Sequence, residues 1–467
     1  MPSNRIGRNI AFYLPWALSW LFYEQPLVSY FIAWLGSFYI FFLTYTGAVL
    51  PLPDDMKKGQ QLMRPVFLPH IIFAGYMSCT SIFYLLNELG YRNFQVPESI
   101  FLPSDDNLWL IARCQRYYCL GHAAYISGIM TFMKYPVASK YFINRSEIAD
   151  LLLNVAIVSL PVSLVFTYIP SLSQFYYQFN SLSFIAGTLA LAFAIPRKKK
   201  SNTVISIILY LLNFYQALVS GFKEPIIISV LVLGVFLYGS YKRVVVLTFV
   251  RILLALFFIL PTYVTVFRQT AWSGESDAKA ASELAVDAAL NEDLPQDETN
   301  WNFLVYRLSE IDMFKGFLKS TPEKVDFYGT TLLEQSATAL IPRFFWPSKP
   351  STEALVMERV YNADVVYRGS SVSAKPAFIV DAYLSFGAYG IFILLFVYGA
   401  VTQLISLKAE QLFAGYTFGC ALVFSGLFQI LWRGLSLEFL INSVFWSYVT
   451  MLLINKICVK KGILKQI

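Results

Sequence analysis

Charged side chains are scarce in this chain. Only 14% of its 467 residues are Asp, Glu, Lys or Arg, whereas 57% are apolar and 17% are aromatic. Soluble proteins average about 25% charged residues, so the composition excludes an ordinary soluble protein. A helix that crosses a membrane needs about 20 mostly apolar residues. The apolar runs here have that length and do not alternate, and we therefore predict an all-α polytopic membrane protein.

Residues that bind metals are also few. The two histidines, His70 and His122, begin different apolar runs and are too few for a zinc site, so we expect structural roles for them. The five cysteines have no metal-ligand spacing, and Cys114 and Cys119 could pair only if the local geometry allowed it. We find no phosphate-cradling glycine loop and no motif that reads nucleic-acid bases. The sequence therefore predicts no cofactor, no metal and no nucleic-acid partner.

Twelve apolar segments are long enough to be candidate membrane spans. The first is short and contains Pro15, so it could instead lie in the interface. No small-residue cleavage site follows it, and we expect it to stay as an anchor. The twelve segments lie near 9–25, 28–50, 67–87, 118–134, 149–170, 175–195, 203–220, 225–240, 244–267, 378–406, 412–431 and 436–455.

The lysines and arginines of the short loops predict the orientation of the chain. Short loops rich in these residues stay cytoplasmic, and here they include the "RKKK" of 197–200 together with both ends. The long insertion at 268–377 then lies outside. We expect three regions, which are a nine-helix membrane region at 1–267, an outer loop at 268–377 and a three-helix membrane region at 378–467.

The outer loop changes character at Trp301. Residues 273–300 are acidic and poor in aromatics, which suggests a solvated arm or a loose helix. The following "WNFLVYRLSEIDMFKGFL" has apolar residues at helical spacing and predicts one amphipathic helix on the membrane or on the bundle. Arg307 falls inside its apolar stripe, while Glu310 and Asp312 fall near the edges. A cation so placed needs a partner.

The segment "IPRFFWPSKP", residues 341–350, combines two cations, three prolines and three aromatic residues. The prolines restrict the backbone around Arg343 and Lys349. Arginine offers a planar fork and lysine a point charge to phosphate groups, and Trp346 with its phenylalanine neighbours could stack on sugar faces. The segment is a candidate diphosphate clamp. The alternative is an interfacial belt whose cations contact lipid phosphates.

This segment, "DAYLSFGAYGIF" further along, "GFKEPIII" at 221–228 and the large outer loop together resemble one known family. The chain is similar to bacterial polysaccharide polymerases of the Wzy type, also called O-antigen or oligosaccharide repeat-unit polymerases. The resemblance implies a membrane glycosyltransferase that joins undecaprenyl-diphosphate-linked oligosaccharides at the outer face of the bacterial cytoplasmic membrane. Its expected partners are these lipid-linked oligosaccharides, membrane lipids and a chain-length-regulating membrane protein.

That reaction gives the candidate residues their roles. Arg343 and Lys349 would stabilise charge on the leaving diphosphate. Glu310, Asp312 or Asp381 would be the general base, although Asp381 could instead pair with a loop cation. Candidate substrate-binding residues, for most of which lipid headgroups or ordinary loop contacts are the alternative, are Arg307, Arg368, Lys375, Lys223, Arg113, Arg116 and Trp346.

Three other classes use a similar layout. An O-antigen ligase takes the same lipid donor, but ligases resemble each other in carrying a histidine in the outer loop, and 268–377 has none. A lipid-linked oligosaccharide flippase usually shows two similar halves with short connections, and this chain has no internal repeat. A scaffold for envelope assembly is the third alternative.

Overall fold

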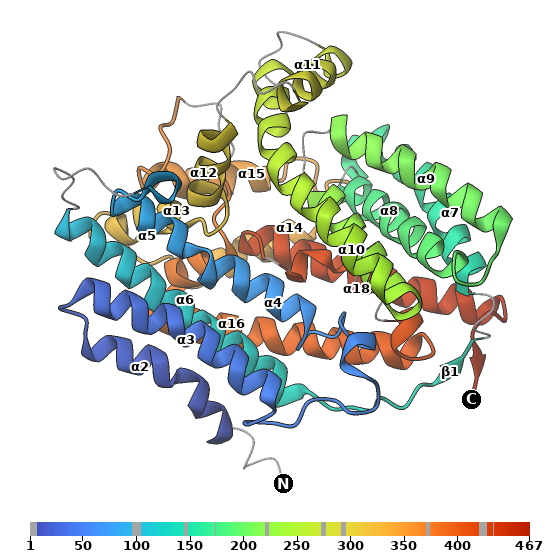
Figure 1. Cartoon of the computed structure of the whole chain (residues 1–467), viewed down its shortest axis with the longest axis horizontal. Coiled ribbons are helices and arrows are strands. Elements are labelled where there is room, and N and C mark those ends of the chain that lie inside the picture. Colours follow the sequence, from blue (N-terminus) through green and yellow to red (C-terminus); the bar gives the residue numbers. More distant parts are fainter. Residues whose placement is uncertain are drawn as a thin grey trace. The chain divides into compact units, whose positions relative to one another are not determined.

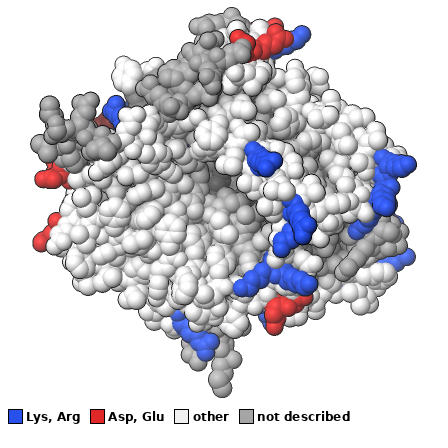
Figure 2. Space-filling model, viewed as in Figure 1, with Lys and Arg blue, Asp and Glu red and all other residues white. Residues whose placement is uncertain are grey.

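The computed structural model describes residues 7–95, 104–143, 148–172, 174–219, 224–271, 277–290, 296–369, 374–419, 427–432 and 434–467. Over these ranges the chain is helical apart from short connections and one antiparallel pairing of β1 (Tyr141–Phe142) with β2 (Lys465–Gln466). On the face drawn in Figure 2 most of the surface belongs to uncharged side chains.

Seven of the described helical segments are long and apolar enough to cross a membrane. They fit the predicted class of all-α membrane protein, while the count of twelve spans stays a prediction. The seven are Pro26–Thr46, Leu68–Glu88, Ile148–Thr167, Lys200–Val219, Pro225–Ala271, Phe378–Leu412 and Leu437–Lys460.

The chain divides into two compact units. Unit one comprises Met1–Ala138, Leu304–Gln411 and Phe428–Lys456, and unit two comprises Ser139–Phe303, Leu412–Leu427 and Ile457–Ile467. The insertion at 268–377 contributes residues to both units. The three consecutive regions expected from the sequence stay a prediction.

Unit two contains the helices drawn in green in Figure 1. Its elements are α7 (Ile148–Thr167), η6 (Pro170–Leu172), α8 (Gln174–Ala194), α9 (Lys200–Val219), α10 (Glu224–Ala271), α11 (Ala278–Leu290) and the start of α12 (Gln296–Arg307). Helical geometry in α10 is interrupted at Tyr241, between the two spans predicted there. The acidic segment after α10 contains a packed helix, because Ala281, Ala285 and Ala289 of α11 are buried against Tyr263 and Phe267 of α10.

Unit one is a helical bundle to which the second half of the predicted outer loop contributes. Figure 1 shows α2, α3 and α6 side by side. Its elements are η1 (Ile10–Tyr13), α2 (Leu14–Leu21), α3 (Pro26–Thr46), η2 (Lys58–Gln60), α4 (Leu68–Ala74), the π-helix η3 (Gly75–Cys79), α5 (Ser81–Glu88), η4 (Arg92–Phe94), α6 (Asp105–Phe132), α13 (Ile311–Ser320), α14 (Thr331–Leu340), α15 (Thr352–Asn362), α16 (Phe378–Leu412), η8 (Gln429–Trp432) and α18 (Leu437–Lys460).

Small residues let α6 and α16 approach closely at the centre of unit one. A Cβ atom added to Gly128 of α6 would lie 2.1 Å from the carbonyl oxygen of Phe396. A Cβ atom added to Gly399 of α16 would lie 2.0 Å from the carbonyl oxygen of Tyr125. Close backbone contact through small residues is the usual way in which helices associate in lipid, where the hydrophobic effect does not drive their packing.

The two histidines and two of the cysteines are buried inside unit one. The Nε2 atoms of His70 and His122 lie 2.8 Å apart, and neither residue is exposed. Tyr45 places its hydroxyl 3.2 Å from Nδ1 of His70. Cys114 and Cys119 are free and buried. All four residues therefore lie within the packed interior, where structural roles were expected for the histidines.

Buried ion pairs join distant parts of unit one. The guanidinium of Arg64 donates to Asp55 at 2.6 Å and to Glu410 at 2.8 Å. The guanidinium of Arg359 on α15 donates to Asp381 of α16 at 3.0 Å and to Glu438 of α18 at 2.6 Å. Arg64 and Glu410 are 346 positions apart, and Arg359 and Glu438 are 79 positions apart. These two pairings fix tertiary structure that no local pattern predicts.

Loss of Arg359 should destabilise the protein strongly. Replacing Arg359 by methionine leaves Asp381 and Glu438 buried without their cation, which typically costs about 3–5 kcal/mol. The matched control is Arg368→Met, which removes an exposed pair with Glu358 and should change the stability much less. Unfolding of the purified protein in detergent measures both. Equal effects of the two substitutions would contradict a structural role for the buried cluster.

Candidate functional site

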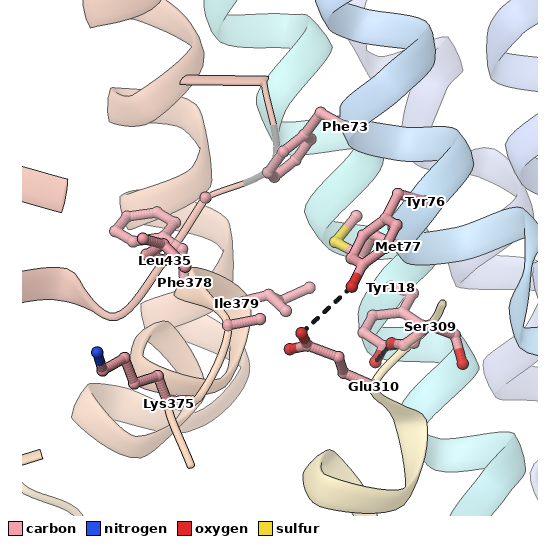
Figure 3. Close-up of a pocket in the computed structure, with 12 residues that line it drawn as sticks. Phe73, Tyr76, Met77, Tyr118, Ser309, Glu310, Lys375, Phe378, Ile379 and Leu435 are labelled. Carbon is pink, nitrogen blue, oxygen red and sulfur yellow. Dashed lines mark hydrogen bonds between the residues drawn. The ribbon is translucent and has the colours of Figure 1, made fainter. Parts of the chain in front are cut away.

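A cleft in unit one brings together residues from five segments of the chain. The empty space within it, which includes open solvent at its mouth, is about 490 Å³. The walls come from α4 with the π-helix η3, from α6, from the junction between α12 and α13, from the start of α16 with the residues just before it, and from the residues before α18 (Figure 3). The lining residues are Phe73, Tyr76, Met77, Tyr118, Ser309, Glu310, Lys375, Ala377, Phe378, Ile379, Gly434 and Leu435.

Irregular backbone shapes three of these walls. Tyr76 and Met77 lie in the π-helix, whose extra residue per turn changes the face on which the following side chains emerge. Gly434 has φ +69°, and an added Cβ atom would meet Cβ of Phe378 at 3.1 Å. Glu310 has φ 53°, an uncommon value for a residue other than glycine. Such conformations cluster at functional sites, where the surrounding structure holds them in place.

The junction that carries Glu310 corrects a prediction made from the sequence. The single amphipathic helix expected from Trp301 is two helices, because α12 ends at Arg307 and α13 begins at Ile311. Contacts from elsewhere in unit one hold the break open. The Tyr118 hydroxyl donates to the Ser309 carbonyl at 2.7 Å, and the Tyr76 hydroxyl donates to the Arg307 carbonyl at 3.0 Å. The break turns the carboxylate of Glu310 into the cleft (Figure 3).

The environment of Glu310 favours its neutral form. Burial raises the pKa of this carboxyl above its ordinary value, while a hydrogen bond from Tyr76 and the charge of Arg307 act in the opposite direction. The Tyr76 hydroxyl lies 3.3 Å from Oε1 of Glu310. A carboxylate with a raised pKa in a cleft is suited to accept a proton from a substrate. Of the predicted general bases, Glu310 is the one that lines the cleft.

Other groups in the cleft can hold a ligand with both hydroxyl groups and apolar faces. Ser309 is 3% exposed, and its Oγ has no hydrogen-bond partner within the described part of the chain. The rings of Phe73 and Phe378 contribute apolar walls. A sugar presents this combination of hydroxyls and a flat apolar face.

Lys375 also lines the cleft, as the only predicted cation among its lining residues. Its Nζ pairs with Glu353 at 2.9 Å and lies 4.5 Å from the ring centre of Phe439. In Figure 3 the amino group points away from Glu310. Lys375 therefore borders the site and keeps a carboxylate partner of its own.

Arg343 and Lys349 bind their own loop. The ammonium of Lys349 donates to the carbonyls of Ala339 and Ile341 at 3.2 and 2.7 Å, next to the end of α14. Arg343 donates to the Lys349 carbonyl at 2.8 Å. Burial and the nearby charge of Arg343 lower the pKa of Lys349. The two cations hold the proline-rich loop together, and neither lines the cleft.

The aromatic residues of the same loop point outward. Phe344 is 64% exposed and Phe345 is 74% exposed. Trp346 donates from its indole nitrogen to Ser348 at 3.1 Å. This arrangement matches the alternative of an interfacial belt as closely as it matches a sugar-stacking surface.

The remaining predicted carboxylates have structural partners. Asp381 is fully buried and pairs with Arg359, a cation from the predicted outer loop, as the ion-pair alternative expected. Asp312 accepts a hydrogen bond from Tyr84 at 2.7 Å. Neither carboxylate lines the cleft.

The remaining predicted cations are dispersed. Arg368 pairs with Glu358 on the surface, and the side chain of Arg307 is exposed. Arg113 and Arg116 have different neighbours, because Arg113 donates to Tyr383 at 3.3 Å and Arg116 donates to Ser29 at 2.8 Å. Lys223 lies outside the described residues.

Sequence reasoning missed Tyr76, Ser309 and Gly434. The π-helix shifts the face on which Tyr76 emerges, so regular helical spacing could not assign it to the cleft. For Gly434 one signal was available, because it is a glycine that lies directly before the span predicted at 436–455.

Comparison with known proteins gives one family. No curated protein and no solved structure matches the chain. A family model described as "Domain of unknown function (DUF8712)" matches residues 14–466, which is nearly the whole length. The chain belongs to this family, the DUF8712 family.

Proposed function

We propose that this chain is a membrane glycosyltransferase that joins oligosaccharide repeat units carried on undecaprenyl diphosphate. The observation that carries the proposal is a cleft lined by Glu310, with its raised pKa, by aromatic side chains, and by Ser309, whose Oγ has no hydrogen-bond partner among the described residues. The resemblance of "IPRFFWPSKP" and "DAYLSFGAYGIF" to polysaccharide polymerases supplies the substrate class. The donor is already activated, so the reaction requires no nucleotide.

The proposed reaction is a displacement at an anomeric carbon. Glu310 accepts the proton of an acceptor hydroxyl as the hydroxyl oxygen forms a bond to that carbon. The bond from the carbon to the lipid diphosphate breaks, and the electron pair leaves with the diphosphate. Ser309 and the rings of Phe73 and Phe378 position the acceptor sugar.

Negative charge that develops on the diphosphate needs cations. Among the predicted cations, Arg307 is the one whose charge lowers the pKa of Glu310, and its side chain is exposed. Lys375 could exchange Glu353 for a diphosphate oxygen at the edge of the cleft.

The proposed protein resides in the bacterial cytoplasmic membrane with both termini inside and the cleft opening outward. A cysteine introduced at exposed Glu323 should react with an impermeant maleimide in intact spheroplasts. A cysteine at exposed Lys461 should react only after permeabilisation. The opposite pattern would contradict the orientation derived from the loop charges.

Glu310→Gln should abolish polymer formation while the protein still folds. Loss of a general base typically lowers the rate by about 10² to 10⁴. In a deletion strain that expresses the variant, single lipid-linked repeat units should accumulate outside the membrane. Glu323→Gln, an exposed carboxylate outside the cleft, is the matched control and should restore long chains. Repeat units stranded inside would indicate a flippase, and wild-type polymer from Glu310→Gln would exclude the proposed base.

The rate should depend on pH through Glu310. The base works when deprotonated, so activity falls as the pH drops through its raised pKa. Tyr76→Phe removes a hydrogen bond that lowers this pKa, and the acid limb of the pH profile should therefore move to higher pH. Rates measured with purified lipid-linked units over a pH series test this. If the acid limb of the Tyr76→Phe profile moves to lower pH or does not move, Glu310 does not control that limb.

A further inference from the structure

One buried arginine in unit one has no carboxylate partner among the described residues. Among the described residues, the arginines with fully buried side chains are Arg64, Arg116 and Arg359. Arg64 and Arg359 each pair with two carboxylates. Arg116 forms no ion pair within the described part of the chain. Its charge is as deeply buried as the other two and is not neutralised there.

The contacts of Arg116 do not supply the missing charge. Its Nη1 donates to Oγ of Ser29 at 2.8 Å, and Ser29 in turn donates to the carbonyl of Ser19 at 2.8 Å. The Trp20 ring centre lies 5.1 Å from the guanidinium carbon. Nε of Arg116 has no partner in the described chain. A hydroxyl and an aromatic face solvate a cation only in part.

This arrangement is unfavourable unless an anion binds. Arginine cannot be deprotonated in proteins, so burial does not neutralise it. A charge left buried without compensation costs several kcal/mol. An anion from outside the chain removes that penalty, and its identity depends on where Arg116 lies relative to the membrane.

The neighbours of Arg116 place it at the level of lipid headgroups. Trp20 is in the last turn of α2 and Ser29 is in the first turn of α3, so both flank the connection between these helices. Three aromatic side chains are exposed around this connection, with Trp20 at 40%, Phe22 at 37% and Tyr23 at 45%. Exposed tryptophan and tyrosine are typical of the membrane interface. The anions abundant at that level are lipid phosphates.

We propose that Arg116 anchors a binding site for the phosphate of a membrane lipid, at the end of the α2, α3 and α6 bundle. Trp20 forms the wall of the site that faces the lipid. The indole N–H of Trp16, one turn away on the same helix, has no partner in the described chain and is a second donor for the headgroup. The site does not include the cleft of Glu310, and it does not rest on the proposed reaction.

Stability of an Arg116→Met variant tests the uncompensated charge. In detergent without lipid, the full-length variant should be at least as stable as wild type, because a buried charge without a counter-ion is removed. Arg92→Met, which removes an exposed cation, is the control for the change in net charge. An Arg116→Met protein that unfolds or fails to fold without lipid would show that the charge is already compensated, and would overturn the proposal.

Binding of defined lipids tests the ligand. Phosphatidylglycerol and a polyprenyl phosphate are titrated separately into the detergent-purified full chain, and bound lipid is counted by native mass spectrometry. Wild type and Arg92→Met should bind about tenfold to a hundredfold more tightly than Arg116→Met, as expected for hydrogen bonds to a charged group. The lipid that wild type binds with the higher affinity identifies the source of the phosphate.

Two outcomes of the titration would contradict the site. Equal binding by all three proteins would show that Arg116 does not hold the lipid. Inorganic phosphate that weakens lipid binding to wild type, when it is added at the same concentration as the lipid, would show a site for a free anion instead.

Discussion

The buried guanidinium of Arg359 holds the architecture of unit one together. It joins α15 to the first turns of α16 and α18 through Asp381 and Glu438, and Asp381 also accepts the backbone N–H of Leu437 at 2.7 Å. These first turns adjoin Phe378 and Leu435, which form one side of the cleft. An ion cluster removed from water tolerates little displacement, because any lost contact exposes an unpaired charge to a low dielectric. The shape of the cleft therefore depends on a cluster that does not line it.

Scarcity of charge makes the partner of each charged residue informative. Lys349 and Arg343 are satisfied by backbone carbonyls of their own loop, and Arg368 is satisfied by Glu358. Charges satisfied in this way stabilise the fold and are poorly placed to act on a substrate. Glu310 differs, because burial opposes its charge and its side-chain partner is a tyrosine hydroxyl. Arg116 differs too, because its partner is a serine.

Composition and the length of the apolar runs predicted the helical membrane class, since both depend on local sequence. The boundary predicted between the spans 225–240 and 244–267 coincides with the interruption of α10 at Tyr241. The candidate site was only partly predictable. No helix-breaking residue marks the junction at Ser309 and Glu310, and the break there depends on hydroxyl groups of distant tyrosines. The pairing of Arg359 with Glu438 spans 79 positions and leaves no periodic signal. Proline spacing around Arg343 predicted a stiff loop and could not show that its cations turn inward.

The predicted outer loop packs against membrane-type helices over part of its length. Helix α16 is interrupted at Phe386 and Gly387, and the carbonyls of Leu384 and Ser385 before this break accept the backbone N–H groups of Tyr328 and Gly329. At the other end of α14, the carbonyl of Leu340 accepts the indole N–H of Trp446 on α18. Irregular backbone is tolerated inside a membrane protein where another segment satisfies its polar groups. Residues 328–340 therefore lie beside two candidate spans. The lipid-linked substrate that we propose would be able to approach this part of unit one without leaving the membrane.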